Sequence, residues 1–578
     1  MNGLATLFSF VFLGTGLFGT HLPDTAPSAP VVRVAAENGT AGTVEMGIGL
    51  APIADWGTQQ PFIDVMKAGR PWLGHLPGQF GGMGYEDLVA LGLLDANGWP
   101  LRIPPELGSI GTLVLTDMPP GAVSLAGRYR LGFDGTGIVE VSGRARNVRY
   151  AKGEVTFDYD PGPGPVDIRI QRSAPSDPVR NITVIKQENL ARYAAGERFN
   201  PDWIARIKGF KSLRFMDWMA TNNATLSNWA ARPKPDDVTY AWQGAPIEVQ
   251  VSLANELGID PWFNVPHLAD DAFVRAFAEY VRDTLDPGLT AYVEFSNEVW
   301  NWQFAQARWA DAQAQARWGQ NDAWVQYYAL RATQVARIWS QAYAGAPEGR
   351  LINVIATQTG WIGLEEAILN APLWQAENPA NPIPAEAFDA YAVTGYFGGV
   401  MGVAEYEGMV QGWLADSLTE AQNAATAAGL SGDAAAQYVA MHRYDQATEV
   451  AAQDVRDGSI SDTPGGALSD LTGRVWPHHA NVARQYGLDL IMYEGGTHIV
   501  GIGAQVDKPD LTAFMQHLNY SPEMGAIYTT LLEAWRDVGG GLFTAYNDVY
   551  APSKWGSWGA LRHLDDDNPR WDALISFQ

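Results

Sequence analysis

The chain carries at residues 292–300 the sequence Tyr292-Val293-Glu294-Phe295-Ser296-Asn297-Glu298-Val299-Trp300. Its first half is short and rich in aromatic and β-branched residues, which favours a buried strand that runs into polar residues. Because side chains alternate along a strand, Glu294, Ser296 and Glu298 share one side. In a barrel of parallel strands, Glu298 would emerge at the C-terminal rim, where such barrels carry their chemistry.

Runs of the same kind alternate with helical patterns from about residue 200 onward. A helix with Phe273, Phe277 and Val281 on one face precedes this strand, and a long helix follows it. The expected strands lie at residues 44–49, 213–216, 261–265, 291–295, 351–355, 390–393, 488–492 and 541–544. This alternation predicts the α/β class and a (β/α)8 TIM barrel.

A different pattern separates the first expected strand from the second. Short alternating runs with Gly, Pro and Asp turns predict an antiparallel β-sandwich domain over residues 86–190. We therefore expect an export segment at 1–30, the first barrel strand and its loop at 31–85, and the rest of the barrel at 191–578. A helical insertion of unusual length is expected at about 400–480.

Composition limits the function. The 578 residues have a net charge of −26 and contain no cysteine, which excludes thiol chemistry and makes nucleic-acid binding improbable on electrostatic grounds. Residues 4–18 are mostly apolar and are followed by a segment rich in Pro and small residues. This pattern favours an export signal and a secreted or periplasmic location over stable membrane insertion.

A second strand also ends in a carboxylate. Residues 488–492 run into Tyr493-Glu494-Gly495-Gly496, where the glycines let the backbone turn beside the acid. Two strand-end glutamates, Glu298 and Glu494, would then face each other. Such a pair suits glycoside cleavage, in which one carboxyl donates a proton and the other attacks or stabilises the reacting carbon.

Residues 294–298 on the fourth expected strand and residues 493–495 on the seventh resemble clan A glycoside hydrolases, which are retaining (β/α)8 enzymes. The resemblance implies that Glu298 is the acid/base, Glu494 the nucleophile and Asn297 a partner of the sugar 2-hydroxyl. It also implies that Tyr396 donates its hydroxyl to Glu494; packing in the core is the other interpretation of Tyr396. The chain departs from the pattern at Val299, where many members have Pro.

Other polar residues have two interpretations each. Arg214 orients the nucleophile or forms an ordinary buried salt bridge, and His267 and His498 bind sugar hydroxyls or serve the structure. Glu294 is expected to be a buried structural carboxylate. A repeated Asn-Glu pair at residues 255–256 reads as a helix end and is rejected.

The 22 Trp residues are expected mostly in the core. The expected exceptions follow strands in loops and are sugar-stacking candidates: Trp300, Trp302, Trp555 and Trp558. The acidic run at residues 565–567 fits no calcium-loop spacing, so no metal and no cofactor are assigned.

These residues together predict a retaining hydrolase that cleaves a β-linked oligo- or polysaccharide by double displacement. Two alternatives stay open. One is a carbohydrate-binding protein on the same fold without activity, and the other is an inverting or lyase-type polysaccharide enzyme that uses a Tyr or His base. The sugar, the linkage and the oligomeric state are not fixed by the sequence.

Overall fold

The structure is a computed structural model that describes residues 44–398 and 400–578. The expected export segment at 1–30 lies outside the described residues. Eight parallel strands close into a barrel, each paired with its neighbours in chain order. They are β1 (Met46–Gly49), β11 (Ser212–Arg214), β12 (Asp260–Val265), β13 (Ala291–Phe295), β14 (Leu351–Ala356), β15 (Ala390–Phe397), β16 (Asp489–Thr497) and β17 (Phe543–Ala545). The predicted (β/α)8 barrel is confirmed.

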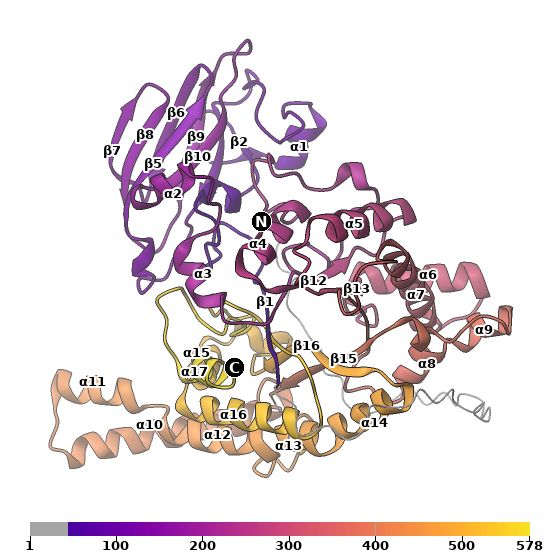
Figure 1. Cartoon of the computed structure of the whole chain (residues 1–578). Helices are drawn as coiled ribbons and strands as arrows, with labels where there is room; N and C mark the ends of the chain where they lie inside the picture. Colours follow the sequence, from indigo (N-terminus) through magenta and orange to yellow (C-terminus); the bar gives the residue numbers. More distant parts are fainter. Residues whose placement is uncertain (1–43, 399) are drawn as a thin grey trace.

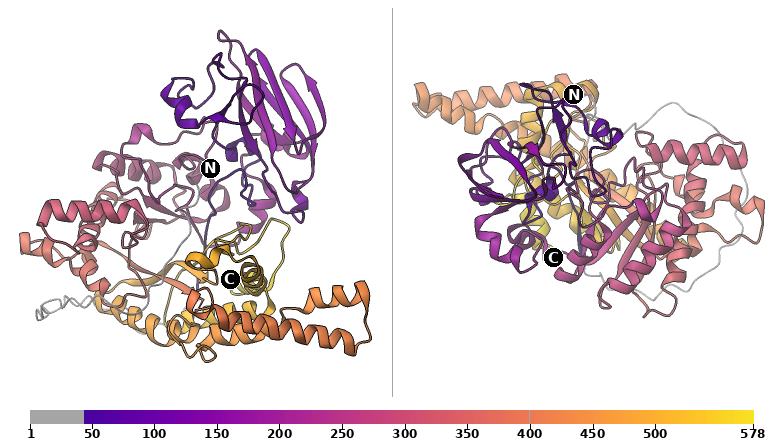
Figure 2. Two further views of the ribbon diagram at one scale, coloured as in Figure 1. Left: turned by 180° about the vertical axis from the view of Figure 1, so that it is seen from behind. Right: turned by 90° about the horizontal axis from the view of Figure 1, so that it is seen from above.

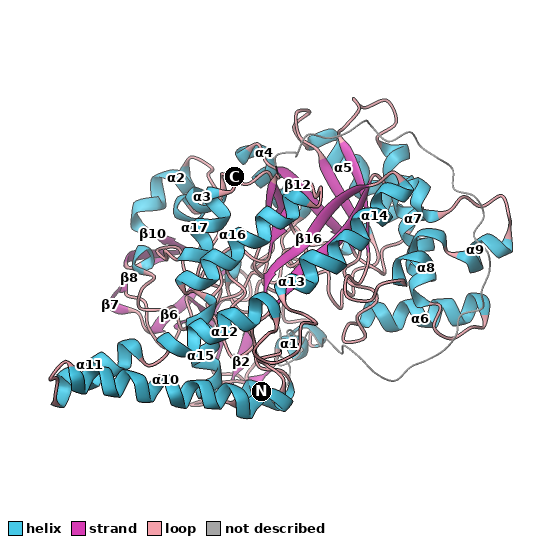
Figure 3. Ribbon diagram, turned by 90° about the horizontal axis from the view of Figure 1, so that it is seen from below, coloured by secondary structure: helices cyan, strands magenta, loops and turns pink. Residues whose placement is uncertain are grey.

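Helices surround the barrel, as the view from below shows (Figure 3). α5 (Asp271–Thr284) buries Phe273, Phe277 and Val281 on one face, as its sequence period predicts, and its first turn is capped by the side chain of Asp270. Further helices of the described chain include α3 (Pro201–Ile207), α4 (Ile247–Leu257), α6 (Ala305–Trp318), α7 (Trp324–Ala342), α8 (Leu364–Asn370), α9 (Pro372–Glu377), α14 (Trp476–Tyr486), α15 (Pro509–Asn519), α16 (Pro522–Asp537) and α17 (Pro569–Ser576).

Two antiparallel sheets lie between β1 and β11 in the chain, which confirms the added sandwich (Figure 1, indigo to magenta). One has the order β10 (Arg180–Lys186), β5 (Gly127–Asp134), β8 (Glu154–Tyr159), β7 (Arg146–Ala151). The other has the order β3 (Gly82–Met83), β2 (Leu73–His75), β4 (Ser109–Val114), β9 (Val166–Ser173), β6 (Gly137–Gly143). A short helix, α1 (Tyr85–Ala90), follows β3.

The segment that leads from β1 into these sheets binds both parts of the molecule. The carboxylate of Asp64 accepts a hydrogen bond of 2.8 Å from the backbone N–H of Val184 in β10. Two residues earlier, the ring of Phe62 packs against Trp218 and Tyr240 beyond β11, with centroids 5.5 and 5.3 Å apart. The sandwich is thus braced directly against the barrel.

The helical insertion forms a projecting arm. α10 (Glu407–Ala427) and α11 (Gly432–His442) extend beyond the barrel in all three views of Figures 1 and 2, and α12 (Asp445–Asp457) returns to it. Val410 near the start of α10 is fully buried in the barrel core, whereas α11 buries none of its residues. In the described part of the chain, no helix combines the length and apolar character that crossing a membrane requires.

Candidate active site

Arg214 connects three strands at the C-terminal end of the barrel. It ends β11 and is 1% exposed. Its Nη1 donates to Glu494 Oε1 at 2.6 Å, and its Nη2 donates to Glu294 Oε2 at 2.9 Å and to Asn297 Oδ1 at 2.8 Å. The guanidinium fork suits several acceptors in fixed directions, so it sets the relative positions of β11, β13 and β16.

Oε2 of Glu294 accepts hydrogen bonds from several buried donors. Besides Arg214, its Oε2 accepts from Trp262 Nε1 at 3.0 Å and from Asn264 Nδ2 at 2.8 Å. Trp262 and Asn264 both belong to β12, so this carboxylate ties neighbouring strands together inside the barrel. Its contacts are those of a structural carboxylate.

Glu298 lies in a tightly wound loop that follows β13. Ser296 has a φ of 63° and Glu298 a φ of 40°, a left-handed conformation that residues with a Cβ seldom adopt. The Glu298 side chain accepts from the Tyr493 hydroxyl at 3.0 Å on Oε1 and from Asn301 Nδ2 at 3.0 Å on Oε2. The loop therefore turns its carboxyl toward β16.

Glu494 lies immediately after a bulge in β16. Val393 of β15 pairs with Met492 and Thr394 pairs with Glu494, so Tyr493 is an extra residue between two ladder positions. Glu494 Oε2 accepts the Tyr396 hydroxyl at 2.9 Å, and its Oε1 receives Arg214. Because of the bulge, adjacent residues Tyr493 and Glu494 both reach the same group of side chains.

The two glutamates differ in their electrostatic surroundings. Glu298 is 5% and Glu494 1% exposed. Burial, with the nearby charge of Glu494, raises the pKa of Glu298 to about 8. Burial also raises the pKa of Glu494, but the Arg214 cation and the Tyr396 hydroxyl oppose that rise by direct contact. Arg214 donates no hydrogen bond to Glu298, so the pair favours a proton on Glu298 and a charge on Glu494.

Asn297 has its amide orientation fixed on both sides. Its Oδ1 accepts from Arg214, and its Nδ2 donates to Asn222 Oδ1 at 3.1 Å. Asn222 also accepts from Gln306 Nε2 at 2.8 Å. One hydrogen of the Asn297 amide stays available to a ligand.

Asp217 is a further carboxylate of this region that sequence reasoning missed. Its Oδ2 accepts from the Tyr546 hydroxyl at 3.3 Å, and Tyr546 packs against Tyr396 and Trp558. Burial and the charge of Glu494 raise the pKa of Asp217 to about 7. The sequence did contain a signal for it, because Asp217 lies only three residues after Arg214, at the C-terminal end of the same strand.

The two histidines named in the sequence lie in different places. The His498 ring packs against the rings of Tyr396 and Trp558, at centroid distances of 6.1 and 5.4 Å. It therefore lies beside Tyr396, the residue that donates to Glu494. His267 packs against Trp309 at 5.4 Å beyond β12. Burial lowers the pKa of each to about 4, so both rings are neutral near pH 7.

The four candidate tryptophans differ in exposure. Trp300 is 6% exposed and packs against Tyr328 and against Tyr493, the residue that donates to Glu298. Trp558 is 4% exposed, and its Nε1 donates to the Trp555 carbonyl at 2.9 Å. Trp555 is partly exposed and lies under Lys554 Nζ, whereas Trp302 is 48% exposed. Trp302 therefore offers the largest free ring surface of the four.

One cluster of the described residues has metal-ligating side chains: Glu365, His478 and His479 offer atoms within 4.8 Å of one another. Both ring nitrogens of His479 already have partners, the Tyr391 hydroxyl at 2.8 Å and the Thr359 carbonyl at 2.9 Å. His478 Nε2 lies 2.6 Å from Glu365 Oε1. These contacts describe a hydrogen-bond network in which His479 has no ring nitrogen left for a metal.

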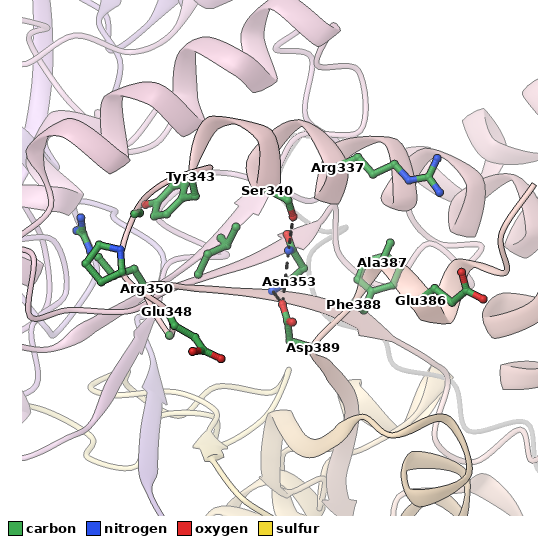
Figure 4. A pocket seen from close by; sticks show the side chains of 14 residues that line it. Arg337, Ser340, Tyr343, Glu348, Arg350, Asn353, Glu386, Ala387, Phe388 and Asp389 are labelled. Carbon is green, nitrogen blue, oxygen red and sulfur yellow. Dashed lines mark hydrogen bonds between the residues drawn. The ribbon is translucent and has the colours of Figure 1, made fainter. Parts of the chain in front are cut away.

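A pocket of about 490 Å³ lies at the opposite end of the barrel strands (Figure 4). Its walls include Arg350 and Asp389, which precede β14 and β15, and Tyr343 beyond α7. Asn353 Nδ2 donates there to Ser340 Oγ at 3.1 Å. Because the pocket lies at the N-terminal end of the strands, it is separate from the carboxyl pair. That end of such barrels serves stability.

No family model matches the chain, and no curated protein matches it. Among solved structures, it is similar to an endo-1,4-β-D-xylanase of Clostridium thermocellum in complex with xylohexaose (9% identity, 82% of this chain, 91% of that chain, TM-score 0.33). It is also similar to a broad-specificity endoglucanase of Bacteroides salanitronis (10% identity, 65% and 83%, TM-score 0.29). A third is an endo-β-1,4-mannanase of Thermotoga petrophila (12% identity, 64% and 70%, TM-score 0.29). These likenesses concern the fold alone.

Proposed function

We propose that this protein is a retaining glycoside hydrolase that cleaves a β-linked oligo- or polysaccharide, with Glu494 as nucleophile and Glu298 as acid/base. The observation that carries the proposal is that the two strand-end carboxyls have different hydrogen-bond donors. Arg214 and Tyr396 contact Glu494, whereas Glu298 contacts only the neutral donors Tyr493 and Asn301. Surroundings that move the pKa values of two carboxyls apart let one act as the acid and the other as the nucleophile.

In the first step, a Glu494 oxygen attacks the anomeric carbon and the bond to the leaving oxygen breaks. Glu298 gives its proton to that oxygen, and a glycosyl ester forms on Glu494. In the second step, the Glu298 carboxylate takes a proton from water, and the water oxygen attacks the anomeric carbon. The ester bond breaks, Glu494 regains its charge beside Arg214, and the sugar leaves with its original anomeric configuration.

The neighbouring residues have supporting roles in this proposal. Asn297, held by Arg214 and Asn222, offers its remaining amide hydrogen to the sugar 2-hydroxyl. Tyr396 directs the nucleophile through its hydrogen bond. Asp217, Asn222 and Asn301, which belong to the polar residues around the pair, are partly exposed.

The experiment that tests the assignment is covalent trapping. The protein is incubated with activated 2-deoxy-2-fluoro-β-glycosides of glucose, xylose and mannose, and its peptides are mapped by mass spectrometry. We expect one sugar on the peptide that contains Glu494, and no label in Glu494→Gln. A label on another carboxylate would overturn the assignment. Binding of β-glycans without label or product would instead favour the carbohydrate-binding alternative.

We also propose a secreted or periplasmic location, which rests on the apolar sequence near the N-terminus. N-terminal sequencing of the exported protein tests it. The expected mature chain begins near Val31. Retention of the full chain in the cytoplasm would contradict the proposed location and leave the proposed reaction untouched.

A further inference from the structure

Two exposed indoles, in the loops that follow β13 and β14, pack against one buried indole. Trp302 is 48% and Trp361 54% exposed, whereas Trp324 is 5% exposed. The Trp324 ring centroid lies 5.2 Å from that of Trp302 and 6.3 Å from that of Trp361, with the planes tilted by 56° and 51°. Trp324 is thus the shared support of two rings that face solvent.

The loops that carry the exposed rings are fixed by polar contacts. The backbone N–H of Trp361 donates to Gln358 Oε1 at 2.7 Å, and that of Gly363 donates to Glu365 Oε2 at 2.9 Å. Gly363 has a φ of 99°, which favours glycine. In the other loop, the Trp302 carbonyl accepts from Arg308 Nη1 at 2.9 Å. Large apolar rings that are exposed on ordered loops mark binding surfaces.

The loops that carry the two rings indicate which part of a substrate the rings would contact. Trp302 lies four residues after Glu298 in the loop that follows β13, and Trp361 lies in the loop that follows β14. Both loops therefore open at the end of the barrel that carries the two glutamates. The acid/base group stands on the side of the bond where the leaving oxygen is protonated. Sugar units on that side would extend over the loops next to Glu298.

We propose that Trp302 and Trp361, supported from below by the buried Trp324, form an aromatic platform that binds the leaving-group portion of a β-linked glycan chain. The indole faces stack on the CH-rich faces of the sugar rings. The inference rests on the proposed function, because the roles of Glu298 and Glu494 assign the platform to the leaving-group side of the scissile bond. It adds a binding surface in which Trp361, with its support Trp324, is a residue that sequence reasoning did not select.

The test uses the full chain in a Glu494→Gln background, which removes turnover. Xylohexaose, cellohexaose and mannohexaose are titrated by calorimetry against this parent and against the same protein with Trp361→Ala or Trp302→Ala. Phe80→Ala is the matched control, because Phe80 is 56% exposed and belongs to the segment between β2 and β3. Melting temperatures verify that each variant is folded.

We expect each platform variant to weaken binding of the hexasaccharide that the parent binds best by about three- to tenfold, whereas Phe80→Ala leaves it unchanged. With Glu494 intact, the KM for that hexasaccharide should rise in the platform variants while kcat changes little. Unchanged hexasaccharide affinity in the platform variants overturns the inference, as does an equal loss in Phe80→Ala or no binding by the parent. Turnover that persists in Glu494→Gln would refute the proposed function separately, because the binding comparison does not depend on it.

Discussion

The Tyr493 hydroxyl donates to Oε1 of Glu298 at 3.0 Å, although Tyr493 precedes Glu494 directly in the chain. Successive residues of a regular strand point to opposite faces, so this contact depends on the bulge that makes Tyr493 an extra residue in β16. One irregular strand end therefore supplies the proposed nucleophile and a donor to the proposed acid/base.

Replacing Tyr493 with Phe tests this coupling. The hydroxyl stabilises the ionised form of Glu298, so its loss should raise the pKa of Glu298 further above its present value of about 8. We expect the alkaline limb of the kcat/KM profile to move to higher pH in Tyr493→Phe, with the maximum reduced by about tenfold or less. The pH dependence of kcat/KM for both proteins is the measurement. An alkaline limb at the same pH would show that Glu298 is not the group that titrates.

The burial of Glu298 has a consequence for stability. Its folded pKa is about 8 and its ordinary value is 4.5, so between these values the folded chain holds a proton that the unfolded chain has lost. The resulting contribution to the free energy of unfolding is present below the ordinary value and is lost as the pH rises through about 8. Glu298→Gln removes this dependence. We expect it to raise the melting temperature more at about pH 8.5 than at about pH 5, by about 1–3 °C. A larger gain at the lower pH would contradict the assigned direction.

Removal of the proton donor should affect substrates according to their leaving groups. In Glu298→Ala, we expect kcat/KM for a natural glycan to fall by about 10²–10⁴-fold, since that leaving oxygen needs a proton. A dinitrophenyl β-glycoside, whose leaving group needs none, should still form the glycosyl ester on Glu494. Added azide should then release a β-glycosyl azide, which NMR identifies by its anomeric configuration. An α-azide product would instead indicate inversion.

The barrel and its two strand-end acids could be predicted from the sequence because buried parallel strands read as short apolar runs that end in polar residues. The same logic selected Arg214, and the family resemblance selected Tyr396; both donate hydrogen bonds to Glu494. Asn222 and Tyr546 were missed because they lie in loops after strands, where no periodicity assigns a side chain to the site. The strands β2 and β3 have three and two residues, which is too short for an alternating pattern to be seen in the sequence.

Exposure of individual tryptophans could not be predicted either. Trp300 and Trp302 are two residues apart in one loop, yet one is 6% and the other 48% exposed. The difference arises because Trp300 packs on Tyr493 from a strand distant in the sequence. Loop sequences do not encode such contacts in a local pattern.

Arg214 is the residue whose loss should be most costly. It is buried and donates to Glu294, Glu494 and Asn297. Lysine in its place keeps the charge but cannot reach three acceptors in fixed directions. We expect Arg214→Lys to lower the free energy of unfolding by about 3–5 kcal/mol and to reduce kcat more than KM. Denaturant unfolding and steady-state kinetics measure both effects. Arg206→Lys, at a partly exposed position of α3, is the matched control and should change neither.

The projecting arm should be dispensable for folding and for turnover of small substrates. Gln422 of α10 and Val439 of α11 line the same hollow, so a short Gly-Ser turn can join them in place of residues 423–438. The removed segment contains no member of the barrel core, to which Val410 at the base of α10 belongs. We expect the shortened protein to keep its kcat/KM for an aryl β-glycoside within about twofold, since the carboxyl pair is untouched, and to melt within about 2 °C of the parent. Val410→Asp, which puts a charge into that core, should by contrast unfold at a clearly lower temperature. A shortened protein that is folded but inactive on the aryl glycoside would show that the arm acts on the site itself.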